Sequence, residues 1–312
     1  MDPKMNCTVP LQILNYSIAG HSLSIHDCCG LELSENMENF HPFLTSGPAA
    51  PGILDIVIED TLDFGKDFGN RILLSDISEI WDARFRFEII NGFYLTSILD
   101  ESGGVGWRML SNSDFSRSWI SPGPKDRFNY TKLSWLIMIS FGQTVLAHRT
   151  LLLHASVVMG NGRAFAFLGR SGTGKSTHSR MWLREFKEFE LLNDDNPAVR
   201  IHGDGKVMVY GTPWSGKTAC YRPIGTELLG VVRLSQAKNN NFRQIEGRSA
   251  FLSMLPSASA IRWDREIFDR MLILVQEITK KVRSGHLECL PDVHSARLCH
   301  DCFHKSGIGA IL

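Results

Sequence analysis

The chain is 312 residues long, which is enough for two domains with substantial cores. Its 33 basic and 33 acidic residues cancel, so the net charge gives no electrostatic reason to expect nucleic acid or an anionic membrane as a partner. The 7 cysteines are odd in number and irregularly spaced, which is typical of a reducing compartment. The first residues lack an apolar core of signal-peptide length, so we expect a cytoplasmic protein.

Residues 1–128 show the patterns of antiparallel strands. Leu23 and Ile25 alternate with polar neighbours, and an Asn-Gly pair within residues 84–95 predicts a hairpin. A Pro-Gly-Pro segment that ends at Pro124 indicates a boundary. We therefore predict a smaller β-rich N-terminal domain over 1–128. Its role in an acceptor site or in a homo-oligomer interface is left open.

Residues 129–312 alternate strand and helix patterns, which predicts an α/β domain. The apolar stretch 132–148 is interrupted by polar residues and is shorter than the ~20 residues that span a bilayer, so it predicts a buried helix rather than a membrane segment. A long amphipathic helix is predicted farther on by the apolar residues Ile267, Met271, Leu274, Val275, Ile278 and Val282.

The segment Gly169–Thr177 (Gly-Arg-Ser-Gly-Thr-Gly-Lys-Ser-Thr) matches the phosphate-binding loop G-x-x-x-x-G-K-[S/T] at each fixed position. Residues 163–168 predict a strand before the loop, and residues 178–188 predict a helix after it. A loop between a strand and a helix can surround an anion with backbone N–H groups and with the N-terminus of the helix. We therefore predict an ATP site with Mg²⁺, or alternatively Mn²⁺. Its contacts are Gly169, Ser171, Gly172, Thr173, Gly174, Lys175, Ser176 and Thr177.

Two of these residues have defined chemistry. Lys175 is expected to reach the β- and γ-phosphates and to assist their transfer, and the Ser176 hydroxyl is expected to ligate the metal.

A second segment, 211–218 (Gly-Thr-Pro-Trp-Ser-Gly-Lys-Thr), has the same spacing. Pro223 follows too soon for a helix to begin there, and without a helix no dipole supports a bound phosphate. We interpret this second loop as part of an acceptor site, and an irregular surface loop is the alternative. Its candidate substrate residues are Trp214, Lys217 and Arg222, with Lys217 also a catalytic candidate.

Between the two loops, an apolar stretch at 191–192 leads to Asn193, Asp194 and Asp195, which predicts a strand that delivers paired carboxylates to the nucleotide. At a strand end the chain can turn, so both carboxylates are expected to point inward. One carboxylate can hold Mg²⁺ while the other accepts a proton from an attacking hydroxyl. The alternative is an Asp-Asp-Asn-Pro turn, and the nearby phosphate loop favours the catalytic interpretation.

Upstream, His154 interrupts an apolar strand pattern over 151–158, and Gly160-Asn161-Gly162 predicts a hairpin turn into the strand of the phosphate loop. A histidine in such a strand is either a hydrogen-bonded core residue or a group that the hairpin carries toward the phosphates.

The order of His154, the phosphate loop and Asp194-Asp195 resembles the kinase core shared by HPr kinase/phosphorylase and ATP-dependent phosphoenolpyruvate carboxykinase. Leu-His-Ala-Ser-Val-Val and the phosphate loop are similar to carboxykinase segments, and Asn-Asp-Asp-Asn-Pro-Ala-Val is similar to the HPr kinase Ala-Asp-Asp-Ala-Val. With Gly-Thr-Pro-Trp-Ser-Gly-Lys following, the pattern is most similar to bacterial HPr kinase-like proteins. The resemblance is clear over 150–220, is weaker toward the C-terminus and is absent before residue 130.

This resemblance implies a P-loop kinase core with a mixed, strand-rich sheet over 129–312. It also implies residue roles: Asp194 as acid/base, Asp195 as metal ligand, and His154 as a metal ligand or a neighbour of the phosphates. Lys175 and Ser176 match the phosphate and Mg²⁺ contacts.

The implied activity is transfer of the ATP γ-phosphate to a hydroxyl of a serine-type acceptor, which is a small molecule, peptide or protein. The chain is shorter than a carboxykinase and shows no arginine-bearing region for oxaloacetate. Nor does the second loop match the segment by which HPr kinase engages its protein partner. The alternatives are a carboxykinase-type lyase and a nucleotide sensor without turnover.

Overall fold

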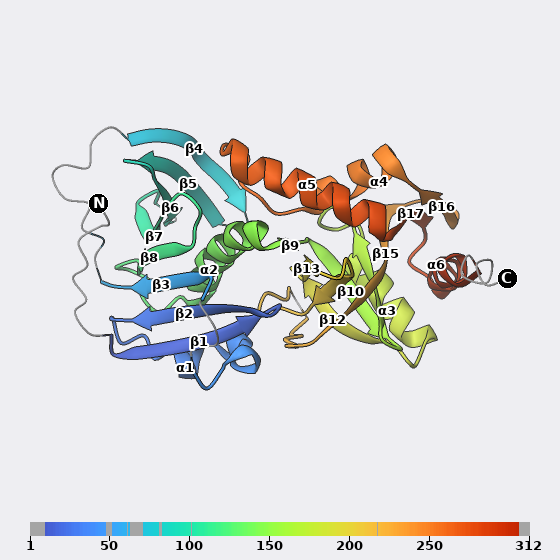
Figure 1. Ribbon diagram of the computed structural model, residues 1–312, viewed down its shortest axis with the longest axis horizontal. Coiled ribbons are helices and arrows are strands. Elements are labelled where there is room, and N and C mark those ends of the chain that lie inside the picture. Colours follow the sequence, from blue (N-terminus) through green and yellow to red (C-terminus); the bar gives the residue numbers. More distant parts are fainter. Residues whose placement is uncertain are drawn as a thin grey trace. The chain divides into compact units, whose positions relative to one another are not determined.

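The computed structural model describes residues 10–47, 52–60, 62, 71–80, 83–100, 102–216 and 218–305. The chain divides into two compact units, Met1–Val145 and Leu146–Leu312, each built on its own large sheet (Figure 1). The sequence suggests a boundary near residue 128. The division lies farther along because the intervening helix packs on strands of the first unit.

The first unit holds an eight-stranded sheet. The strands, in sheet order, are β1 (Gln12–Ile18), β2 (His21–Asp27), β3 (Leu54–Ile58), β8 (Arg117–Ser121), β7 (Val105–Ser111), β6 (Phe93–Leu99), β5 (Ala83–Ile90) and β4 (Arg71–Ile80). The predicted hairpin is confirmed, since β5 and β6 pair antiparallel through Asn91 and Gly92, both at positive φ. The short helices α1 (Leu33–Asn36) and η1 (Glu38–Phe43) follow β2.

Helix α2 (Tyr130–Thr144) confirms the predicted buried helix. It begins at Asn129, whose side chain accepts a hydrogen bond from the Lys132 N–H at 3.1 Å. Its contacts are with β3 and β7, and the Ser140 hydroxyl lies 2.7 Å from the Ser118 hydroxyl of β8. The turn η2 (Val145–His148) follows. Within the described ranges, no helix is long and apolar enough to cross a membrane.

The second unit holds a nine-stranded mixed sheet. Seven strands lie in the order β12 (Glu190–Asp195), β10 (Ala155–Gly160), β11 (Arg163–Leu168), β15 (Gly225–Gln236), β14 (Val207–Tyr210), β13 (Ala198–Ile201) and β9 (Thr150–Leu152). Strand β17 (Arg283–Cys289) pairs with β15, and β16 (Asn241–Ile245) pairs with β17. The β11–β15 and β15–β17 pairs are parallel and the other pairs of this sheet are antiparallel, so the sheet is mixed. With helices between its strands, the chain is an α/β protein.

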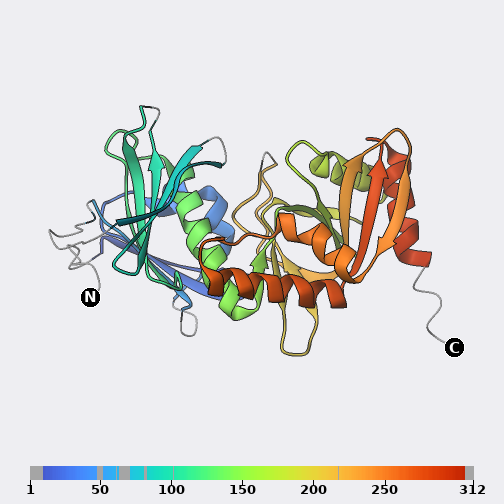
Figure 2. The same ribbon diagram turned by 90° about the horizontal axis from the view of Figure 1, so that it is seen from above.

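Helices cover both faces of the second sheet (Figure 2). On one face, α3 (Lys175–Glu185) packs against α6 (Val293–Lys305). On the other, α4 (Gly247–Met254), which continues into η3 (Leu255–Ser257), packs against α5 (Arg265–Lys281). The predicted apolar stripe is confirmed, and Val282, which directly follows α5, is buried with it. The buried stripe residues within the helix are Ile267, Met271, Leu274, Val275 and Ile278.

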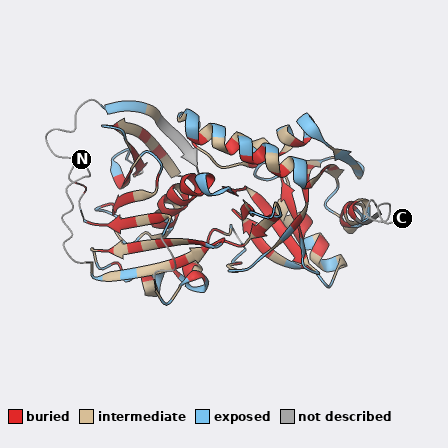
Figure 3. Ribbon diagram, in the orientation of Figure 1, coloured by how far each residue is buried: buried red, intermediate tan, exposed pale blue. Residues whose placement is uncertain are grey.

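Aromatic side chains fix α3 on the sheet. The Trp182 ring of α3 lies 5.0 Å from the Phe165 ring and 5.3 Å from the Phe167 ring of β11, centroid to centroid. All three are fully buried, and Figure 3 shows that the central strands of this sheet are largely buried. Such pairs contribute about 0.5–1.5 kcal/mol each beyond the area that they bury. The strand before the phosphate loop and the helix after it are thereby held together.

Candidate functional site

The loop between β11 and α3 spans residues 169–174, and α3 begins at Lys175, three residues earlier than the sequence predicts, and ends at Glu185. Gly172 and Gly174 have φ values of 77° and 108°, which glycine adopts without strain. At Gly169 an added Cβ would lie 2.9 Å from Cβ of Thr173, so only glycine fits where the loop folds back. The glycines therefore build a tight turn that ends at the first residue of a helix.

The N-terminus of α3 has no side-chain cap among the described residues. The first intrahelical bond runs from the His178 N–H to the Gly174 carbonyl at 2.8 Å. The preceding N–H groups of the first turn have no partner within the helix, and the helix dipole adds partial positive charge there. This end of α3 is suited to an anion.

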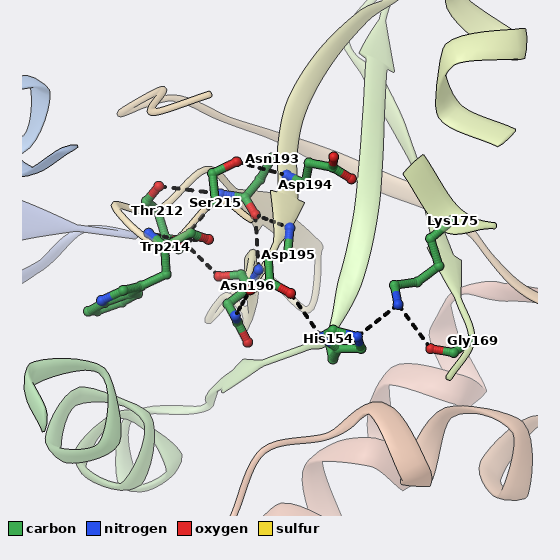
Figure 4. Close-up of polar contacts among 10 residues, drawn as sticks. All are labelled: His154, Gly169, Lys175, Asn193, Asp194, Asp195, Asn196, Thr212, Trp214 and Ser215. Atoms are coloured by element: carbon green, nitrogen blue, oxygen red, sulfur yellow. Dashed lines mark hydrogen bonds and ion pairs between the residues drawn. The ribbon is translucent and has the colours of Figure 1, made fainter. Parts of the chain in front are cut away.

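Lys175, His154 and Asp195 form a hydrogen-bonded chain at this loop (Figure 4). The Lys175 Nζ lies 2.7 Å from His154 Nε2 and donates to the Gly169 carbonyl at 3.1 Å. His154 Nδ1 lies 3.0 Å from Oδ1 of Asp195. An ammonium group can only donate, so Nε2 accepts and Nδ1 carries the proton that is donated to the carboxylate. His154 is therefore a neutral bridge between a cation and an anion.

Burial lowers the pKa of the Lys175 ammonium, the charges of Asp195 and Asp194 oppose that shift, and repulsion by Arg233 adds to it. The lysine is therefore held in a partly desolvated position that favours an additional anionic partner.

Strand register explains why these side chains meet. In β10, Ala155 pairs with Leu168 of β11 on one side and with Asp195 of β12 on the other. The residue before Ala155 therefore lies between the start of the phosphate loop and the carboxylate pair. The predicted turn at Asn161 and Gly162 is confirmed, with φ values of 51° and 73°. The hairpin thus carries His154 to the loop.

The carboxylates of Asp194 and Asp195 differ in their surroundings. Asp194 is buried, with 7% of its surface exposed, and its Oδ2 accepts a hydrogen bond from the Thr218 hydroxyl at 2.9 Å. Asp195 points toward His154, and Asn196 Nδ2 donates to its Oδ2 at 2.8 Å. Figure 4 shows the two carboxylates on different sides of the strand, so the expectation that both point the same way is wrong. The strand continues through Asp195, and its alternation is kept.

The second loop lies along the Asp pair. Ser215 forms a bridge with Asp195, and the N–H of Gly216 donates to the Asp194 carbonyl at 3.1 Å. The Thr212 hydroxyl donates to the Asn196 carbonyl at 2.7 Å. Lys217 lies outside the described residues. The loop therefore supports the carboxylates, chiefly through its backbone and hydroxyl groups.

The other candidate substrate residues lie elsewhere. Trp214 has 5% of its surface exposed, and in Figure 4 its ring points away from His154 and Lys175. Arg222 Nη1 pairs with Glu190 Oε2 at 2.5 Å, at the first residue of β12 and hence at the opposite end of the strand from Asp195. The structure does not bring these two side chains to the Lys175–His154–Asp195 chain.

A metal ion at this site would draw few ligands from the protein. Within the described ranges, no three His, Cys, Asp or Glu side chains gather as a metal-binding group. The available oxygen donors beside the loop are the hydroxyl of Ser176, at the start of α3, and the carboxylate of Asp195. That set suits Mg²⁺, which usually combines one or two protein oxygens with substrate phosphates and water.

Sequence reasoning missed Arg233. It lies near the end of β15 and pairs in parallel register with Leu168, the last residue before the phosphate loop. Its guanidinium donates to the Ser253 carbonyl and to the Ser257 hydroxyl, both at 3.3 Å. An arginine inside the apolar run 228–234 was the available signal.

Two hollows adjoin the phosphate loop. One, of about 420 Å³, is lined by the apolar side chains of Met181, Leu234, Leu290 and Pro291 and by residues of the loop and α3. It has the size and lining of a site for a flat, largely apolar group such as a nucleobase. The other, of about 440 Å³, shares Gly172, Thr173, Leu234 and Gln236 with the first, and most of its lining residues are polar, Arg233 among them.

No family model matches this sequence, and no curated protein matches it. Among solved structures, the chain is similar to the Hpr(Ser) kinase/phosphatase from Coxiella burnetii, with 10% sequence identity and a TM-score of 0.29. The match covers 50% of this chain and 95% of that chain. This is a weak structural resemblance.

Proposed function

We propose that the second unit is a phosphotransferase of the HPr kinase-like type, which moves the γ-phosphate of ATP to a hydroxyl acceptor with Mg²⁺ or Mn²⁺. The observation that carries the proposal is the chain Lys175–His154–Asp195 beside a glycine loop that ends at a helix N-terminus. Phosphoryl transfer depends mainly on positioning and on charge neutralisation. Backbone N–H groups, a lysine and a carboxylate for the metal are the groups that this chemistry requires.

The loop would hold the nucleotide through the N–H groups around Gly172 and Gly174. Lys175 would exchange its contact with His154 for the β- and γ-phosphates, which supply more negative charge. The apolar hollow of about 420 Å³ would take the base. Ser176 and Asp195 would hold the metal against the phosphates.

Asp194 is the proposed general base. Its Oδ2 is bound by Thr218, and Oδ1 can accept the proton of the attacking hydroxyl. The acceptor oxygen then bonds to the γ-phosphorus as the bond from that phosphorus to the bridging oxygen breaks, which leaves ADP. His154 orients Lys175 and Asp195 and is a positioning residue in this scheme.

Incubation of the purified chain with γ-labelled ATP, Mg²⁺ and fractionated cell extract tests the proposal. Label is expected in one acceptor fraction, and it should be absent with Lys175→Ala and strongly reduced with Asp194→Asn. Binding of ATP without any transfer, in every fraction, would instead indicate a nucleotide sensor.

A second assay addresses the lyase alternative. Oxaloacetate, Mn²⁺ and ATP should yield no phosphoenolpyruvate, and formation of that product would overturn the kinase proposal.

A further inference from the structure

The hollow of about 440 Å³ adjoins the phosphate loop. Its lining comes from the loop and from the ends of β15 and β17, and consists of Arg170, Ser171, Gly172, Thr173, Arg233, Leu234, Ser235, Gln236 and His286. The ends of parallel strands at one edge of a sheet are the usual place for a ligand in α/β folds. The lining shares Ser171, Gly172 and Thr173 with the loop that is proposed to hold the nucleotide, whereas its residues from β15 and β17 lie outside that loop and outside the Lys175–His154–Asp195 chain.

Positive charge around this hollow is not compensated. Among the described residues, no ion pair joins a carboxylate to Arg170, Arg233 or the neighbouring Arg243, and the last two bond to neutral groups. Burial lowers the pKa of the Arg233 guanidinium, and repulsion by Arg170 lowers it further. Arg170 and Arg233, which repel each other, line the hollow, and Arg243 approaches it through His286. Arginines that have no ion pair with a carboxylate favour an anion from outside the chain.

His286 adds a directed donor. Arg243 can only donate, so the contact of its Nη2 with His286 Nδ1 at 3.2 Å makes that nitrogen an acceptor. Burial and the charges of Arg243 and Arg233 lower the pKa of His286, while Glu288 opposes them, so the ring is neutral near pH 7 and carries its proton on Nε2. Nε2 donates to the Ser235 hydroxyl at 2.9 Å. The Ser235 hydrogen is then available to a ligand in the hollow.

We infer that this hollow binds an oxyanion group carried by the acceptor itself. The acceptor would be a small molecule with both a reactive hydroxyl and a phosphate or carboxylate group. The inference rests on the proposed function, because the nucleotide phosphates are assigned to the loop N–H groups and Lys175. Arg233 lies level with Leu168, where the loop begins, so an anion bound at its guanidinium would lie beside the loop that is proposed to hold the nucleotide phosphates. Arginine recognises both phosphate and carboxylate through paired hydrogen bonds.

The test is a calorimetric titration of anions into the full chain already saturated with Mg²⁺ and the non-hydrolysable analogue AMP-PCP. Inorganic phosphate and malonate are used separately as probes of the two possible anionic groups. We expect one further equivalent of anion to bind, and the probe that binds more tightly identifies the phosphate or the carboxylate class. Arg243→Ala and Arg170→Ala should each weaken that binding by roughly tenfold or more.

Arg265→Ala is the matched control, since it removes the same charge from a side chain that is 95% exposed on α5. It should leave anion binding unchanged. Thermal unfolding of each variant verifies that the chain is folded.

Three results are distinguishable. Absence of AMP-PCP binding would refute the proposed function. Saturable AMP-PCP binding without anion binding, or displacement of the anion by the nucleotide, would overturn the inference alone. Equal anion affinity in Arg243→Ala, Arg170→Ala and the unaltered chain would also overturn it, because the anion would then bind elsewhere.

Discussion

The two loops at 169–177 and 211–218 share one spacing of glycine, lysine and hydroxyl residues, and they use their glycines in different ways. In the first loop, Gly172 and Gly174 have positive φ and let the backbone turn into α3. In the second, glycine allows close approach. An added Cβ would lie 2.2 Å from the Arg222 carbonyl oxygen at Gly211 and 3.0 Å from the Asp194 carbonyl oxygen at Gly216. One loop therefore offers its backbone to a ligand, whereas the other packs its backbone against the chain.

The element after each loop explains this difference. Residues 175–185 form a helix whose Trp182 anchors it to β11. Described residues 218–224 form neither helix nor strand, and Pro223 lies among them. A spacing pattern thus predicts an anion site only together with the element that comes after it.

The largest expected effect separates the two lysines. Lys175→Ala should abolish ATP binding measurable by calorimetry, because it removes the cation at the loop that is expected to contact the phosphates, together with its contact to His154 Nε2. Lys217→Ala should keep most of the binding, since no helix begins behind the second loop. Equal losses in both variants would mean that the loops act together on the nucleotide.

The next effect separates the two carboxylates. Asp194→Asn should keep nucleotide affinity and lower turnover by roughly 10²–10⁴-fold, the usual scale of general-base catalysis. Asp195→Asn should weaken nucleotide binding in the presence of Mg²⁺ and change it little without the metal. Binding assays with and without Mg²⁺, together with turnover, check both variants. A reversed pattern would exchange the two roles, and full activity in both would remove the pair from the mechanism.

A third prediction concerns the stability of the helix behind the first loop. His178 of α3 is 4% exposed, and burial lowers its pKa to about 4. Its folded pKa lies below its unfolded value, so the unfolded chain binds the proton more tightly. Burial of the neutral His178 ring therefore stabilises the fold fully above pH 6.5. As the pH falls from 6.5 toward 4, the free energy of unfolding is expected to decrease by up to about 3 kcal/mol.

Urea unfolding of the chain at about pH 7 and at about pH 4.5 measures the loss of unfolding free energy. Most of the predicted effect of His178 falls between these two pH values. The same measurements on His178→Gln should show a smaller dependence on pH. An identical dependence would assign it to other groups.

The smallest effect belongs to the second loop. Thr218→Val removes the hydrogen bond to Asp194 Oδ2, which should cost about 0.5–1.5 kcal/mol of stability and lower turnover by less than tenfold while ATP affinity stays unchanged. Combining it with Asp194→Asn gives a double-mutant cycle. In the Asp194→Asn background, Thr218→Val should lower turnover hardly any further. If the losses of the two single variants instead add fully in the double variant, Thr218 acts on turnover by a route that does not involve Asp194.

Local patterns predicted the parts of the site that lie close in sequence. The strand–loop–helix at 163–185, the hairpin turn at Asn161 and the stripe of α5 all follow from periodicity and turn chemistry. Arg233 could not be placed in this way, because its position depends on parallel pairing with a strand some sixty residues earlier. Trp214 and Arg222 were assigned by their nearness in sequence to the second loop. In the structure, Trp214 is buried and Arg222 forms an ion pair with Glu190 at the far end of β12, so neither side chain reaches the site.

Strand β15 has a consequence for how the second unit is assembled during folding. One half of the sheet consists of β12, β10 and β11. Both aspartates lie in β12, His154 directly precedes β10, and the phosphate loop directly follows β11. The other half, β14, β13 and β9, is joined to it in the strand order only through β15. Because β15 must close long chain segments to pair with β11, its docking is expected to be slower than formation of the β10–β11 hairpin. A ribosome would therefore expose the whole nucleotide-binding segment before the strand that joins the two halves, and binding ability should appear only when residues beyond 236 have been made.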